Sequence, residues 1–169
     1  MSCFYVIKVV SEKYNSSKMR NYARKIKKVL YSITIDERGR GLFSWLNQKV
    51  SFEVKEDSYL ILYTHSKPVL NLFERLMRHL FQDSELVLEK VIVPNKSIQN
   101  IAIHPSIFEV TIREKGLYVE IMSKDKMIDV LYSESGLIRF TQSIEGDVQK
   151  SVVEVTIKII QHFRDSLKG

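Results

Sequence analysis

Cysteine is nearly absent from this chain, and its scarcity excludes two kinds of site. The 169 residues contain one cysteine, Cys3. A disulfide framework and a cysteine-ligated zinc site both need several cysteines within one chain. Cys3 precedes the apolar run of residues 4–7, where a buried and unreactive thiol is expected. The sequence therefore predicts a chain without internal disulfides in a reducing compartment.

Several signatures of other protein classes are missing as well. No apolar run approaches the roughly 20 residues that cross a bilayer, and the first residues lack the layout of a secretory leader. The sequence contains neither a phosphate-binding loop ending in Gly-Lys-Ser/Thr nor a nucleophile elbow. The histidines fall on separate segments without metal-ligand spacing, at His65, His79, His104 and His162. We therefore expect a soluble intracellular protein, cytoplasmic or nuclear, with no cofactor and no metal.

Positive charge is plentiful and unevenly distributed. The formal net charge is +6. Residues 1–50 alone contain eleven Lys or Arg against three acidic residues, which leaves the remainder slightly acidic. Like charges concentrated in one segment repel one another unless a polyanion compensates them. The asymmetry favours a nucleic-acid partner for the first half of the chain and a protein partner for the C-terminal half.

Residues 1–95 show the order strand, helix, strand, strand, helix, strand. The strands are predicted from β-branched or alternating runs, and the helices from apolar residues spaced by three and four. The first helix follows the capping segment 15–17, and its apolar stripe extends to Ile33. The predicted ranges are 3–10, 16–33, 50–54, 59–63, 66–80 and 86–93. This order is that of a ferredoxin-like βαββαβ unit.

Residues 96–169 show short strands with tight turns and one longer segment. The strands are predicted at 98–103, 107–113, 117–122, 127–132 and 137–141. Residues 151–160 alternate as a strand would, whereas Val148, Val152, Val155 and Ile159 form a helical stripe. About 20 residues without a turn residue are too long for an ordinary strand, so we predict a helix. The predicted fold class is α+β, with a ferredoxin-like unit followed by an antiparallel β-meander that a C-terminal helix closes.

The basic stretch supplies the candidate binding residues. Lys and Arg neutralise phosphates, an Arg guanidinium or an indole stacks on bases, and the glycines of residues 38–41 let backbone approach a phosphate. We expect a basic helix followed by a mobile Arg-Gly loop. On the free face of the sheet, Tyr5 and either Tyr59 or Tyr63 are candidates for stacking on bases. The candidate nucleic-acid-binding residues are Lys18, Arg20, Arg24, Lys25, Lys27, Lys28, Arg38, Arg40 and Trp45.

Three functions fit the sequence. The first is a non-catalytic basic subunit of a larger complex that binds nucleic acid, RNA being favoured over DNA. The second is a protein-assembly subunit whose basic helix meets an acidic partner. The third is a Mg²⁺-dependent nuclease: Asp36 and the strand with Glu53 and Lys55 resemble the pattern in which two carboxylates hold the metal and a Lys supports the attacking water. A Glu-x-Lys alternation also occurs on ordinary exposed strands, so the sequence leaves all three open.

Overall fold

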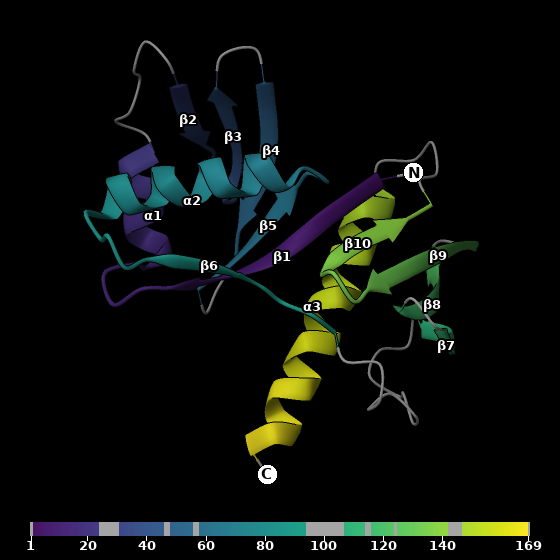
Figure 1. The fold of residues 1–169 in the computed structure, drawn as a ribbon. Coiled ribbons are helices and arrows are strands. Elements are labelled where there is room, and N and C mark those ends of the chain that lie inside the picture. The colour runs from purple at the N-terminus through teal and green to yellow at the C-terminus, as the bar shows by residue number, and fades with distance from the viewer. Residues whose placement is uncertain are drawn as a thin grey trace. The chain divides into compact units, whose positions relative to one another are not determined.

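Two compact units make up the chain. The computed structural model describes residues 2–23, 31–45, 48–55, 58–93, 107–113, 116–123, 125–141 and 147–168 (Figure 1). The N-terminal unit comprises Phe4–Val91, and the C-terminal unit comprises Ile92–Gly169 together with Met1–Cys3. Both units contain antiparallel strands and helix, which confirms the predicted α+β class.

The N-terminal unit is built around an antiparallel sheet in which β1 is an internal strand. Its strands run in the order β2-β3-β4-β5-β1, and β6 also pairs with β1. β1 therefore lies between strands that follow it by about 50 and 80 residues, and the sheet order is not a simple meander. The elements are β1 (Ser2–Val10), α1 (Ser16–Ala23), β2 (Tyr31–Ile35), β3 (Arg40–Trp45), β4 (Gln48–Val54), β5 (Tyr59–Tyr63), α2 (Lys67–Phe81) and β6 (Val87–Lys90).

Helix α2 covers one face of this sheet. The Ser66 hydroxyl caps it by accepting the Val69 N–H at 3.4 Å, and Gln82 ends it in a left-handed conformation. The Phe73 ring lies 5.7 Å from the Phe43 ring and 5.3 Å from the Phe52 ring, measured between centroids. These contacts define the covered face, where apolar side chains leave water and stabilise the unit.

The C-terminal unit pairs its strands in chain order, β7 with β8, β8 with β9 and β9 with β10, all antiparallel. Its last element, α3, is a helix throughout residues 151–160, which confirms the predicted C-terminal helix. α3 buries an apolar stripe that includes Val152 and Val155. Thr156 lies within this stripe, and its hydroxyl bonds the buried Tyr132 hydroxyl at 2.8 Å. The elements are β7 (Ile107–Arg113), β8 (Gly116–Ser123), β9 (Lys126–Ser133), β10 (Leu137–Phe140) and α3 (Asp147–Lys168).

The largest departure from the predicted fold follows the first helix. The described part of α1 is Ser16–Ala23, and Ile33, which the predicted helix included, lies in β2. Polar and apolar residues alternate over Ser32, Ile33, Thr34 and Ile35, which is typical of a strand. Ile33 is fully buried there. β2 and β3 are thus two strands that the helical interpretation missed. The predicted strand 98–103 lies outside the described residues, and the ferredoxin-like unit stays a prediction.

Candidate nucleic-acid interface

A hydrogen-bonded turn joins β2 to β3, where a mobile Arg-Gly loop was predicted. Asp36 Oδ1 accepts the backbone N–H groups of Arg38 and Arg40, each at 2.9 Å. Asp36 Oδ2 lies 3.2 Å from Arg40 Nε, and the Gly39 N–H donates to the Asp36 carbonyl at 3.1 Å. Gly39 has a φ of +84°, which favours glycine. Asp at the first position of a turn and Gly at the fourth are the type I pattern, and this signal could have identified the turn from sequence.

The Asp36 carboxylate makes this turn sensitive to acid. Hydrogen bonding from the Arg40 backbone N–H is the largest cause that holds the pKa of Asp36 below its ordinary value of 3.8. Partial desolvation opposes this effect, while the Arg38 N–H and the Arg40 charge reinforce it. A lowered folded-state pKa contributes stability above the unfolded-state pKa, and that contribution is lost as the pH falls through the folded-state pKa.

We therefore expect Asp36→Ala to be less stable than wild type at neutral pH. The difference in the free energy of unfolding between the two proteins should shrink as the pH falls below 3.8, because protonated Asp36 loses its charge-assisted hydrogen bonds. Urea unfolding at a series of pH values, followed by Trp45 fluorescence, measures this difference. If the difference in the free energy of unfolding stays constant down to the lowest pH measured, the ionised carboxylate has no such role.

Arg20 connects α1 to this turn. A Cβ atom placed on Gly39 would lie 3.2 Å from Arg20 Nη2 and 3.7 Å from Arg20 Nε, so the guanidinium lies against the glycine. Arg20 Nε is buried and has no hydrogen-bond partner among the described residues. The Tyr14 hydroxyl is buried near the Arg20 charge, and burial raises its pKa, an effect that Arg20 partly offsets. The structure thus brings Arg20 of α1 next to the segment that carries Arg38 and Arg40.

The other predicted basic residues divide into two groups. Lys18 is exposed on the first turn of α1, where its backbone N–H donates to Asn15 Oδ1 at 2.7 Å. Arg38 is exposed in the turn between β2 and β3. We call Lys18, Arg20, Arg38 and Arg40 the basic surface. The remaining four, Arg24, Lys25, Lys27 and Lys28, lie outside the described residues.

Trp45 lies apart from the Arg-Gly turn. It ends β3, five residues after Arg40, which is about 17 Å along a strand. Trp45 is half-buried. It follows the buried Phe43 by two residues, so both side chains lie on the covered face of the sheet. Tyr5 is also on the covered face and only 3% exposed. The prediction that Tyr5 stacks on bases is therefore wrong, because its ring packs inside the unit.

The opposite face of β2, β3 and β4 is exposed and polar, and we call it the open face. Three cross-strand rows make it up: Ser32–Ser44–Lys49, Thr34–Leu42–Ser51 and Arg40–Glu53. Leu42 is 37% exposed at the centre of these rows. Sequence reasoning missed Leu42 and Lys49, because their place on one face depends on β3 being a strand.

The residues of the nuclease hypothesis have structural partners. Glu53 Oε2 lies 2.9 Å from Lys55 Nζ, and Glu53 Oε1 accepts the Tyr63 hydroxyl at 2.9 Å. Asp36 uses both carboxylate oxygens within its own turn. Across the part of the chain that the structure describes, no three His, Cys, Asp or Glu side chains are grouped to hold a metal ion. These contacts stabilise the sheet and its turn, and they give a structural reason for each carboxylate.

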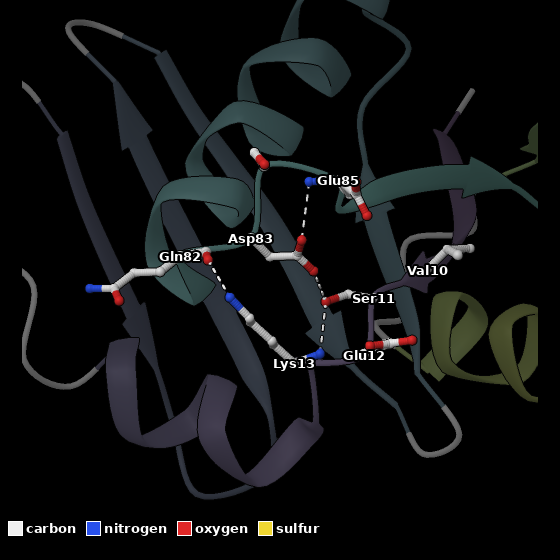
Figure 2. Close-up of a pocket in the computed structure, with 8 residues that line it drawn as sticks. Val10, Ser11, Glu12, Lys13, Gln82, Asp83 and Glu85 are labelled. Atoms are coloured by element: carbon white, nitrogen blue, oxygen red, sulfur yellow. Dashed lines mark hydrogen bonds between the residues drawn. The ribbon is translucent and has the colours of Figure 1, made fainter.

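A hollow lies between the loop after β1 and the loop after α2 (Figure 2). Figure 2 shows Ser11 directed at Asp83 and Lys13 at the Gln82 carbonyl, which Lys13 Nζ reaches at 2.8 Å. The Ser11 hydroxyl is the largest cause that lowers the pKa of Asp83, and the Glu85 N–H adds a bond to the same carboxylate at 3.0 Å. These side chains satisfy one another, so the hollow is a junction between two loops.

Comparison with known proteins assigns no family to the chain. No protein family, curated protein or solved structure matches the chain. None of the described helices combines the length and the apolar character that crossing a bilayer requires.

Proposed function

We propose that the protein binds nucleic acid, RNA in preference to DNA, through the basic surface of Lys18, Arg20, Arg38 and Arg40. The observation that carries this proposal is the position of the Arg20 guanidinium against Gly39. It places Arg20 of α1 beside the turn that carries Arg38 and Arg40, about 20 residues later in the sequence. Surfaces of this kind bind polyanions by neutralising phosphates and releasing counterions.

The scaffold is compatible with this function. The pairing of β4 with β5, of β5 with β1 and of β6 with β1, with α1 after β1 and α2 after β5, supports a ferredoxin-like unit to which β2 and β3 would be additions. We include the ferredoxin-like unit in the proposal. In such a unit helices cover one sheet face. The other face is exposed here at β2–β4, whereas Ile61 of β5 and Val6 of β1 on that face are buried.

A partner protein on the C-terminal unit is the second part of the proposal. Met122 of β8 and Met127 of β9 face each other across the strands and are 40% and 44% exposed. Methionine is flexible and polarizable, which suits contact surfaces that adapt to a partner. This pair favours a protein contact by the C-terminal unit, and the protein would act as a non-catalytic subunit of a larger complex.

Fluorescence anisotropy with labelled RNA and DNA of one sequence tests the nucleic-acid proposal. If the four cations of the basic surface each neutralise one phosphate of a single strand, affinity should fall about 50-fold between about 50 and 200 mM salt. RNA should bind more tightly than DNA at every salt concentration. Failure of the wild-type protein to bind either nucleic acid at low salt, or binding that ignores salt, would refute the proposal.

A further inference from the structure

The open face carries binding groups that the basic surface does not include. Leu42 lies at its centre, flanked by Thr34 on β2 and Ser51 on β4. Leu42 is 37% exposed among hydroxyl groups, whereas Ile61 of β5 and Val6 of β1, farther along the same sheet face, are buried. The opposite face of the same three strands is apolar and covered, so the exposure of Leu42 is a property of this face and not of a loosely packed unit.

Two cations lie on either side of Leu42 along the strands. Arg40 is two residues before Leu42 on β3, and Lys49 pairs across the sheet with Ser44, two residues after it. Each row is about 7 Å from Leu42. Lys49 is exposed, and its ammonium has no ion-pair partner among the residues that the structure describes. Arg40 follows the turn directly, so the open face is continuous with the basic surface at Arg40.

We propose that a single-stranded segment of RNA lies across the open face, an inference that rests on the proposed function. One base would lie against Leu42, and the phosphates on either side of it would approach Arg40 and Lys49. The hydroxyl groups of Thr34 and Ser51, next to Leu42, can donate to or accept from base edges and the 2′-hydroxyl. The three rows of the open face thus supply charged, polar and apolar contacts.

These groups fit a single strand and not a duplex. Paired bases stack on one another, so a duplex offers no base face to Leu42. The major groove of an RNA duplex is deep and narrow, and side chains on a flat sheet do not reach into it. Unpaired bases can turn outward onto a protein surface, and the apolar face of a base loses contact with water when it packs against a side chain such as Leu42.

Two substitutions test the proposal on the full chain, with labelled oligouridine and an RNA duplex of the same length as probes. Lys49→Ala removes one phosphate contact and should flatten the slope of log affinity against log salt for oligouridine by about 0.7. Leu42→Thr keeps a strand-favouring residue and should weaken oligouridine binding about threefold with the salt slope unchanged. Duplex binding should be unaffected by Leu42→Thr.

Matched variants separate this proposal from general effects. Lys67→Ala removes an exposed lysine at the start of α2 and should leave the oligouridine slope as in wild type. Leu42→Met keeps apolar surface and should weaken oligouridine binding less than Leu42→Thr does. If Lys49→Ala and Leu42→Thr both bind oligouridine like wild type, the open face is not used, although salt-dependent binding would still support the basic surface. Tighter binding of the duplex than of oligouridine would also overturn the single-strand proposal, and no binding at all would refute the proposed function itself.

Discussion

Gly41→Ala should destabilise the N-terminal unit by about 2–3 kcal/mol. A Cβ atom on Gly41 would lie 2.2 Å from Phe52 Cζ and 2.5 Å from Phe52 Cε1, far inside contact distance. The Phe52 ring has little room to move, because it is 1% exposed and packs against Phe73. In an unobstructed strand the same substitution would be stabilising, since alanine loses less backbone entropy than glycine on folding. Urea unfolding followed by fluorescence of the single tryptophan, Trp45, reports on this unit.

A double-mutant cycle identifies the ring as the cause. Phe52→Leu shortens the side chain that a Cβ on Gly41 would meet, so Gly41→Ala should cost less in that background than in wild type. The difference should exceed about 1 kcal/mol, as expected for residues in direct contact. Equal costs in both backgrounds, or a Gly41→Ala protein as stable as wild type, would show that the ring does not select glycine at this position.

Lys18→Glu combined with Arg38→Glu should have the largest effect on nucleic-acid binding. Both side chains are exposed, and each reversal replaces attraction to phosphate by repulsion, so we expect affinity at low salt to fall about tenfold for each residue. The salt slope for a single strand should fall by about 1.4, because two phosphate contacts are lost. Neither change should harm folding: Lys18 is the third residue of α1 after the Asn15 cap, where Glu is favourable.

The control is a protein with the same change in net charge elsewhere. Lys150 and Lys158 are exposed on α3, and Lys150→Glu with Lys158→Glu reverses two charges on the C-terminal unit. This control should retain most of the wild-type affinity and salt slope. If both double variants lose the same affinity, the total charge of the protein governs binding and the basic surface has no special role.

Sequence patterns predicted the elements whose periodicity was long. α2 has an apolar stripe over 15 residues. α3, whose residues 151–160 also alternate as a strand would, was predicted as a helix because the segment is too long for an ordinary strand. The region after α1 could not be predicted in the same way, because Ile33 fits both the end of a helical stripe and an alternating strand. Once β3 is a strand, Arg40 and Leu42 lie on one face and Phe43 and Trp45 on the other. The candidate site was therefore only partly predictable: the charges were visible, but the face that presents them depends on register.

The position of β1 also affects how the chain folds. β1 is synthesised before its partners β5 and β6, which follow it by about 50 and 80 residues. At about 5–20 residues per second, β1 waits roughly 4 to 16 s on the ribosome before β6 exists. β5 is synthesised earlier than β6, so the β1 segment Tyr5-Val6-Ile7 gains its two partners one after the other. Strands that are 50 to 80 residues apart in the sequence pair slowly compared with the formation of the α2 helix. We therefore expect the pairing of β1 to limit the folding rate of the N-terminal unit.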